Sequence, residues 1–477
     1  MARYFGPDGI RGVDTLRVVR QFIDLTPATR ARKWQQTQQR FSARHRQFVR
    51  ILRRHFARLV RWLESSPEHD LLDIVREMSE QDQLLLAAYM TCEYSVEAAA
   101  FFNPSIVPHP SQEDLPPGSV RFIMSFRATG EGHVSSVAFR SGIIDASNQL
   151  HLDAVTPFIS TPVIETHRKY DKLLFARKLR EIKTWNAFTG AAIALLSDHF
   201  TRSEMEDAIR SLGDSFERSE RDAGHLAMRW LAESNYRVQF DNDDVLCERV
   251  IFPVSSRESH GIEDARFVRF SNPDGSTCYY ATYTAYSGES IAVQLIETHD
   301  FKTFEICTLN GPAVKDKGMA LFPRQINGAY WMLGRQDGHS ITVSQSNDLH
   351  FWYEYKPILE PRETWELIKV GNCGSPIETP RGWLVLTHGV GPVRRYCIGA
   401  ALLDLNDPTH VIGRMKLPLI EPLESEREGY VPNVVYTCGA MVHAERLIIP
   451  YAMSDTRSGI ASANLAALLD RIISDGP

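Results

Sequence analysis

A repeated pattern of short strands constrains the fold of this 477-residue chain more than any other feature. Five times, an apolar stretch ends in polar residues and is followed by a small-residue turn and a second apolar stretch. The five stretches are Arg121–Arg127, Tyr279–Ser287, Tyr330–Arg335, Trp383–His388 and Leu447–Tyr451. The last three begin about 50 to 65 residues apart, which is the spacing of propeller blades or a related β array. The pattern predicts a mainly β fold built from repeated sheets.

Two segments have helical rather than strand periodicity. Apolar residues recur every three or four positions over residues 28–100 and again over 168–235, as on helices with one buried face. We predict an α-helical N-terminal segment over residues 1–101 and a β domain over 102–477. A helical insertion at about residues 160–235 then separates the first two strand repeats. The apolar stripe of the N-terminal helices must be covered, either by the β domain or in a homo-oligomer.

Composition limits the partners and the location. The formal net charge is −6 with both signs mixed, which favours neither nucleic acid nor a membrane surface. The arginines near residues 44–61 are read as a solvated face or a subunit contact rather than as a nucleic-acid site. The seven cysteines are scattered without metal-ligand spacing, so we expect reduced thiols and no metal. No signal peptide or membrane-spanning stretch is recognisable, and we expect a cytoplasmic protein.

The segment Gly261–Ala265, followed by Arg266, places two carboxylates and a guanidinium at the head of an apolar strand. Strand-like runs precede and follow it, so a sheet is expected to hold these acids in place. An acid beside a fixed cation suits proton transfer, and Asp264 is the leading candidate for a catalytic acid. The alternative is that Glu263 and Asp264 only cap a turn and pair with Arg266 or Arg269.

Other polar side chains follow the ends of the repeated strands. They are Arg127, Thr284, Arg335, His388 and Asp455. In a radial array the inner strands converge on an axis, so these positions are expected to line a funnel suited to a polyhydroxylated or anionic ligand. Lys317 joins them because Phe322-Pro323 indicates a rigid turn that holds its loop near the axis. Structural roles stay open: a solvent-facing lysine, a structural histidine and a turn-capping aspartate.

Gly261–Arg266 resembles the G-[VI]-E-D-P-R signature of glycoside hydrolase family 130, the β-mannoside phosphorylases and related mannosidases, with Ala265 in place of the proline. Further segments agree in the same order along the chain. Asn103–Ser105 resembles N-P-A, Thr284–Ser287 matches T-A-Y-S, Lys317–Pro323 is similar to K-D-x-x-L-F-P, Gly382–Val390 to G-W-L-x-x-x-H-G-V, Gly399–Pro408 to G-A-A-L-L-D-L-x-D-P and Val431–Ala440 to V-P-N-V-V-x-x-C-G-A. The resemblance covers about residues 102–150 and 236–470 and leaves both helical segments outside it.

The resemblance implies a five-bladed β-propeller that cleaves β-mannosidic bonds with inversion, usually by phosphorolysis to α-mannose 1-phosphate. Carried over to the matching position, Asp264 is the general acid, and its proton reaches the glycosidic oxygen through a sugar hydroxyl. The other expected site residues are Lys317, Arg335 and His388 for phosphate, and Arg127, Arg266 and Asp455 for the sugar. The expected partners are a β-mannoside or manno-oligosaccharide and inorganic phosphate, which is a co-substrate; no other cofactor is expected.

The charges opposite Asp264 bear on the choice between phosphorolysis and hydrolysis. Phosphate is already anionic and needs cations to hold it, whereas an inverting hydrolase needs a second carboxylate to activate water. The expected phosphate ligands place cations opposite a lone acid and favour phosphorolysis. An inverting β-mannosidase on the same fold is the first alternative, and a non-catalytic carbohydrate-binding propeller is the second.

One departure from the family pattern favours hydrolysis. Many of the phosphorylases carry an arginine shortly after T-A-Y-S, but the corresponding positions here read Glu289–Ala292. Arg394 and Arg395, which follow His388, could replace the missing charge. The carboxylates that could serve a hydrolase as its base are Glu289, Asp337 and Glu378.

Overall fold

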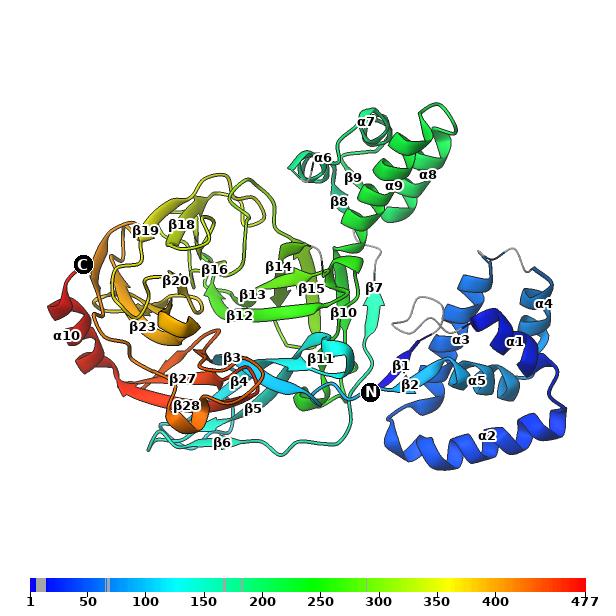
Figure 1. The fold of residues 1–477 in the computed structure, drawn as a ribbon, viewed down its shortest axis with the longest axis horizontal. Helices are drawn as coiled ribbons and strands as arrows, with labels where there is room; N and C mark the ends of the chain where they lie inside the picture. Colours follow the sequence, from blue (N-terminus) through cyan, green and yellow to red (C-terminus); the bar gives the residue numbers. More distant parts are fainter. Residues whose placement is uncertain (6–13, 65, 67–68, 166–168, 182, 289) are drawn as a thin grey trace. The chain divides into compact units, whose positions relative to one another are not determined.

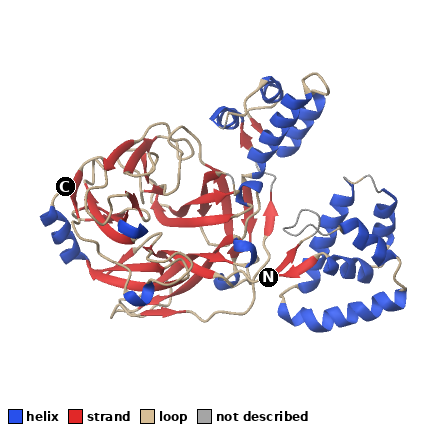
Figure 2. Ribbon diagram, in the orientation of Figure 1, coloured by secondary structure: helices blue, strands red, loops and turns tan. Residues whose placement is uncertain are grey.

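The computed structural model describes residues 1–5, 14–64, 66, 69–165, 169–181, 183–288 and 290–477. These residues form two compact units (Figures 1 and 2). The first unit consists of Met1–Val96 with Thr156–Thr161, and the second of Glu97–Val155 with Pro162–Pro477. Glu289, one of the carboxylates considered above as a hydrolytic base, lies outside the described residues.

The first unit is helical, as its periodicity predicts. Its elements are β1 (Ala2–Tyr4), α1 (Thr15–Ile23), α2 (Pro27–Phe41), α3 (Phe48–Glu64), α4 (His69–Glu77), α5 (Glu80–Tyr89) and β2 (Thr91–Glu93). The hydroxyl of Thr26 caps α2, and Pro27 occupies its first turn, where a missing N–H is harmless. Basic side chains are paired within the unit: Arg44 contacts Glu93 at 2.7 Å and Arg53 contacts Glu80 at 2.6 Å.

The second unit is mainly β, with sheets of eleven, four, five and four strands among its described residues. In chain order we divide these strands into five groups; the first two share the eleven-stranded sheet, where β12 meets β5 through a short parallel pairing of Gly261 with Ser135. The first group is β3 (Ala100–Pro108), β4 (Val120–Thr129), β5 (Ser135–Ile144) and β6 (Leu150–Leu152). The second is β12 (Gly261–Ser271), β13 (Thr277–Tyr286), β14 (Ile291–Thr298), β15 (Thr303–Thr308) and β10 (Tyr236–Gln239). The third is β16 (Ala320–Leu321), β17 (Tyr330–Gly334), β18 (Ile341–Ser346) and β19 (Lys356–Leu359).

The last two groups complete the series. The fourth is β20 (Lys369–Asn372), β21 (Ile377–Thr379), β22 (Gly382–Val390), β23 (Tyr396–Leu403) and β24 (Val411–Arg414). The fifth is β25 (Val435–Tyr436), β26 (Met441–His443), β27 (Arg446–Met453) and β28 (Arg457–Asn464), and helix α10 (Leu465–Asp475) follows it. The five stretches predicted from the sequence lie on β4, β13, β17, β22 and β27. The mainly β prediction is therefore confirmed.

Apolar side chains from neighbouring groups pack together as separate core clusters. Phe139 of the first group packs with Phe267 of the second, and further clusters join the second to the third, the third to the fourth and the fourth to the fifth. Another cluster joins the fifth group to the first, through Met441 and Ile448 with Phe122. Each sheet thus buries both faces against its neighbours in the series.

A helical insertion interrupts the second unit between its first two strand groups. It holds β8 (Tyr170–Asp171), α6 (Lys172–Glu181), α7 (Ala187–Ala194), β9 (His199–Phe200), α8 (Arg202–Ser211) and α9 (Arg218–Glu233) around a core of its own. Short β7 (Val163–Glu165) pairs with β10, and β11 (Val250–Ile251) pairs with β5. In the part of the chain that the structure describes, none of the helices has the length and apolar character needed to cross a membrane.

Candidate active site

A bulge in β12 sets the position of Asp264. The pairing of β12 with β13 shifts register between Glu263 and Arg266, and Asp264 has φ +54°, in the left-handed region that aspartate tolerates better than most residues. Asn103 lies in a matching bulge of β3, between Phe102 and Ser105, with φ +49°. At these bulges the side chains of Asp264 and Asn103 no longer alternate between the two faces of the sheet. The two strands, β12 and β3, contact each other.

Asp264 is surrounded by donors and cations from three strands. Asn103 Nδ2 donates to its Oδ1 at 2.7 Å, and Arg127 Nη1 on β4 lies 3.6 Å from the same oxygen. Arg266 Nη1 donates to its backbone carbonyl at 3.0 Å. Burial acts to raise the pKa of Asp264, but the charges of Arg127 and Arg266, the Asn103 hydrogen bond and the charge of Lys317 outweigh it. The pKa of Asp264 is therefore lowered, which favours its ionised carboxylate.

Glu263 is a site residue for which the sequence predicted only capping of a turn and pairing with Arg266 or Arg269. It is buried and accepts from Arg127 Nη2 at 2.8 Å and from Lys317 Nζ at 2.6 Å. Glu263 therefore holds two cations, Arg127 and Lys317, beside Asp264. The expectation of a lone acid opposite cations is corrected here, because a second carboxylate, Glu263, lies beside Asp264 and holds both Arg127 and Lys317.

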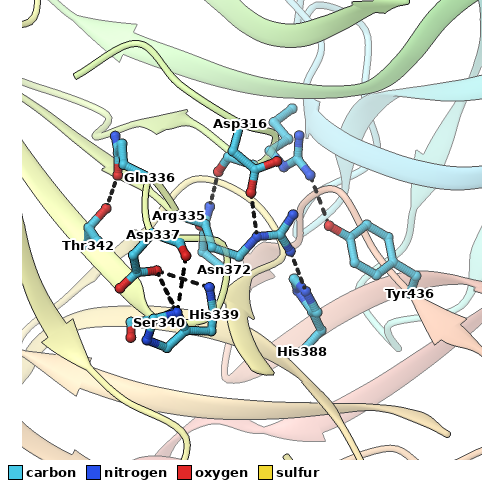
Figure 3. Close-up of polar contacts among 12 residues, drawn as sticks. Asp316, Arg335, Gln336, Asp337, His339, Ser340, Thr342, Asn372, His388 and Tyr436 are labelled. Atoms are coloured by element: carbon cyan, nitrogen blue, oxygen red, sulfur yellow. Dashed lines mark hydrogen bonds and ion pairs between the residues drawn. The ribbon is translucent and has the colours of Figure 1, made fainter. Parts of the chain in front are cut away.

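Arg335 and His388 lie together at the ends of β17 and β22 (Figure 3). Arg335 Nε donates to Asp316 at 3.2 Å, and its Nη1 lies 3.2 Å from His388 Nε2. Burial, then the charges of Arg335 and Arg266, hold the pKa of His388 well below its usual range. His388 is therefore neutral and accepts the Arg335 hydrogen bond through Nε2, so it orients Arg335 rather than adding a positive charge.

Arg266 and Tyr436 connect these two halves of the site. Arg266 is 2% exposed; its Nε donates to the Cys373 carbonyl at 3.1 Å and its Nη2 to the Tyr436 hydroxyl at 2.9 Å. The Tyr436 ring lies edge-on to His388, with centroids 5.1 Å apart. A continuous chain of contacts therefore runs from Asp264 to Arg335.

Asp455 lies in the turn after β27, with φ +51°. Burial and the charge of Asp264 raise the pKa of Asp455 to about 6, although Arg127 and Arg394 act in the opposite direction. The carboxyl is therefore close enough to Asp264 and Arg127 to feel both charges. All seven residues predicted for the site are thus brought into one neighbourhood; their individual roles stay predictions.

Several buried polar atoms around this neighbourhood have no hydrogen-bond partner among the described residues. They are Asn103 Oδ1, Arg127 Nε and Asn372 Oδ1. Buried polar atoms are normally paired, so these three are available to a polar ligand. Asn372 on β20 also donates to the Gly318 carbonyl at 2.7 Å.

The sequence did not predict Asn372 or Tyr436 as site residues. For Asn103 a signal was present, because asparagine, unlike most residues, tolerates positive φ.

The described part of the chain contains no group of three or more histidine, cysteine, aspartate or glutamate side chains that could hold a metal ion.

Other residues that the sequence offered as a hydrolytic base or as a replacement cation have structural contacts. Asp337 accepts the backbone N–H groups of His339 and Ser340 in its own turn, and Glu378 forms a two-pronged pair with Arg324. Arg395 pairs with Glu421 at 2.7 Å.

Residues 234–473 match the sequence profile of the family described as beta-1,4-mannooligosaccharide phosphorylase, glycoside hydrolase family 130. This chain belongs to glycoside hydrolase family 130. The family match includes every predicted site residue except Arg127, and it excludes the N-terminal unit and most of the helical insertion. The resemblance suggested for residues 102–150 lies outside this match and stays a prediction.

Characterised members of family 130 resemble this chain over its C-terminal half. A 1,2-beta-oligomannan phosphorylase of Thermoanaerobacter sp. (strain X514) is 37% identical over 244 residues, which are 49% of this chain and 79% of that protein. A beta-1,2-mannobiose phosphorylase of Listeria innocua is 34% identical over 46% of this chain and 63% of its own length. A solved complex of beta-1,2-mannobiose phosphorylase from Listeria innocua with beta-1,2-mannobiose aligns with 80% of this chain and 93% of that chain, at 24% identity and a TM-score of 0.46.

Proposed function

We propose that this protein catalyses inverting phosphorolysis of β-mannosides, including manno-oligosaccharides, to α-mannose 1-phosphate. The observation that carries the proposal is the chain of contacts that joins the acid Asp264 to Arg335 through Arg266, Tyr436 and His388. A proton donor and an anion-binding guanidinium are thereby held in one rigid site. The family relatives named above, which are phosphorylases, support the same reaction.

The anion site has donors to spare although its cations are paired. A lysine ammonium has three N–H donors and a guanidinium has five. The contact of Lys317 with Glu263 and those of Arg335 with Asp316 and His388 use only some of them. A phosphate ion would accept the remaining hydrogen bonds, and its negative charge would offset the cations that lower the pKa of Asp264. Phosphate binding would thus favour the protonated acid that the reaction needs.

The chemical step needs no second carboxylate. A phosphate oxygen attacks C1 of the mannose on the face opposite the glycosidic oxygen, and the bond from C1 to that oxygen breaks. The leaving oxygen takes the proton of Asp264, relayed by a sugar hydroxyl. Hydrogen phosphate releases its own proton on becoming the ester, so the proton balance closes and the acid is restored. The structural contacts of Asp337 and Glu378 leave neither placed as a hydrolytic base.

We further propose that the five strand groups of the second unit form the blades of a closed five-bladed β-propeller. Support comes from the core clusters, which join each group to the next and the fifth to the first. Residues 102–477 would then be the catalytic domain, with the insertion at about 160–235 between its first two blades and residues 1–101 as a helical appendage. A cytoplasmic location and a homo-oligomer built through the helical segments stay predictions.

Product analysis tests the proposed reaction directly. The protein is incubated with β-1,2- and β-1,4-linked manno-oligosaccharides, with and without inorganic phosphate. Phosphate-dependent release of α-mannose 1-phosphate is expected, and Asp264→Asn should reduce it about 100- to 10,000-fold, which is the usual contribution of general acid catalysis. Release of free mannose at the same rate without phosphate would overturn the proposal.

One observation favours hydrolysis as a second candidate. Asp455 has a pKa raised to about 6 and lies within electrostatic reach of Asp264, so it could act as a base toward water in an inverting hydrolase. In that case mannose release would not need phosphate, and Asp455→Asn would abolish it. Under phosphorolysis, Asp455→Asn should instead weaken sugar binding while the reaction stays dependent on phosphate.

A further inference from the structure

An exposed aromatic pair lies beside the candidate active site. Tyr430 is 67% exposed, and its ring stacks on the imidazole of His133, with centroids 5.5 Å apart and an interplanar angle of 24°. His133 belongs to the turn between β4 and β5, whereas Tyr430 belongs to the link between β24 and β25. The pair therefore bridges the first and fifth strand groups, whose β3 and β27 also lie against each other (Figure 1).

Backbone contacts fasten Tyr430 to the turn that carries Asp455. The N–H of Tyr430 donates to Thr456 Oγ1 at 3.0 Å, and the N–H of Val431 donates to the Ser454 carbonyl at 3.1 Å. A Cβ atom at Gly429 would lie 2.5 Å from that carbonyl, so glycine is required for this close approach. The segment is thus held on both sides of Asp455.

Asp455 connects this pair to the buried acid. Its turn holds Tyr430 through Thr456, and its carboxyl feels the charges of Asp264, Arg127 and Arg394. Next to Arg394, Val393 is 88% exposed, and both residues have positive φ. The side chains of Arg127 and Asp264 are 21% and 17% exposed, whereas Tyr430 is 67% exposed. A sugar chain that extends from Asp264 past Asp455 toward solvent would therefore reach the exposed ring of Tyr430.

We propose that Tyr430 and His133 form an outer subsite that binds a sugar ring on the leaving-group side of the β-mannoside. A pyranose has an apolar C–H face that packs on an aromatic ring, and hydroxyl edges that hydrogen-bond to charged groups such as Asp455 and Arg394. The stacked pair is ordered before the sugar arrives, which reduces the entropy lost on binding. The inference rests on the proposed function and adds a determinant of its acceptor specificity.

The reverse reaction separates this subsite from the site of cleavage. With α-mannose 1-phosphate as donor and mannobiose as acceptor, Tyr430→Ala is expected to raise the KM for the acceptor about 3- to 10-fold, the effect of losing one aromatic contact. The KM for the donor should stay within about twofold. Tyr430→Phe keeps the ring and should behave as the wild type, whereas His133→Ala should show a smaller rise. Equal rises for donor and acceptor, or no change for the acceptor, would overturn the subsite.

A binding measurement keeps the inference independent of turnover. In Asp264→Asn, calorimetry with mannose, mannobiose and mannotriose of both linkages measures affinity without cleavage. Adding Tyr430→Ala should weaken the oligosaccharides about 3- to 10-fold and leave mannose unchanged. If the wild type proves to hydrolyse rather than phosphorolyse, the proposed reaction fails while this comparison still decides the subsite. Unchanged oligosaccharide affinity would reject it.

Discussion

At the residue scale, the neutral state of His388 changes how the proposed phosphate site would work. A protonated imidazole would repel Arg335, but burial and neighbouring charges keep His388 neutral, and its Nε2 accepts the Arg335 hydrogen bond at 3.2 Å. The guanidinium is thereby held between His388 and Asp316. The phosphate affinity of the site would then depend on His388 through the orientation of Arg335.

Removing the imidazole should therefore affect phosphate more than sugar. We expect His388→Ala to raise the KM for phosphate about 10-fold or more, because a hydrogen bond to a charged group contributes about 1.5–3 kcal/mol. His388→Gln, whose amide oxygen can accept the same bond, should recover part of the loss. Initial rates measured against phosphate and against manno-oligosaccharide check this. A larger rise for the sugar than for phosphate would contradict it.

Asp455 should make stability depend on pH in a specific direction. The pKa of Asp455 is about 6 in the folded protein, against the ordinary value of 3.8 expected in the unfolded chain. The folded state therefore binds the proton more tightly than the unfolded state. Asp455 then contributes a penalty to stability that is absent below about pH 4, grows between about pH 4 and pH 6 and is complete above that range. We expect Asp455→Asn to unfold at a higher temperature than the wild type at pH 8, by the equivalent of about 1–3 kcal/mol, with little difference at pH 4. Thermal unfolding at both values tests this; an equal gap would contradict it.

At the scale of elements, the bulge in β12 determines where the acid lies. Two substitutions of Asp264 separate its backbone role from its carboxylate: both Asp264→Gly and Asp264→Val remove the charge, but only glycine adopts φ +54° without strain. We expect the valine variant to be less stable than the glycine variant by about 1–2 kcal/mol in chemical unfolding. Equal stability would show that the bulge relaxes when the carboxylate is lost.

A buried lysine, Lys178, helps to attach the helical insertion to the end of the second strand group. Lys178 Nζ donates to the Leu309 carbonyl at 2.8 Å and pairs with Glu181, which accepts from the Gly311 N–H at 2.7 Å. We expect Lys178→Met to speed amide hydrogen exchange in α6 and in the 309–311 segment about 10-fold, because buried carbonyl and carboxylate groups lose their donor. The exposed Lys183 offers a control in Lys183→Met, which should leave these amides unchanged.

At the scale of the whole molecule, only one of the two units carries the candidate active site. Every residue of the candidate active site belongs to the second unit, whereas residues 1–96 have a core of their own. We expect a variant lacking residues 1–96 to retain kcat/KM within about 5-fold, because it keeps every residue of the candidate active site. Light scattering on the same variant tests the predicted oligomer, since loss of the helices should lower its mass to that of a monomer. A loss of activity above about 100-fold would show that the first unit contributes to catalysis.

The repeated strands and the motif around Asp264 could be predicted from the sequence because both depend on residues close together in the chain. The strands are marked by apolar stretches and turn residues, and the motif by residue types at fixed spacing. The same local reading located the helical insertion and the N-terminal helices. It could not give Glu263 its role, because the partners of that carboxylate, Arg127 and Lys317, are 136 and 54 residues away in the chain.

The sequence by itself therefore determined which elements form, in what order, and which residue types are available for proton transfer and anion binding. Only the tertiary structure decided that Asp264 leaves its strand at a bulge, that His388 is neutral, and that Tyr430 and His133 meet beside Asp455. The physical reason is that burial, charge coupling and bulge direction arise from side chains brought together from distant segments, and no local pattern encodes those distances.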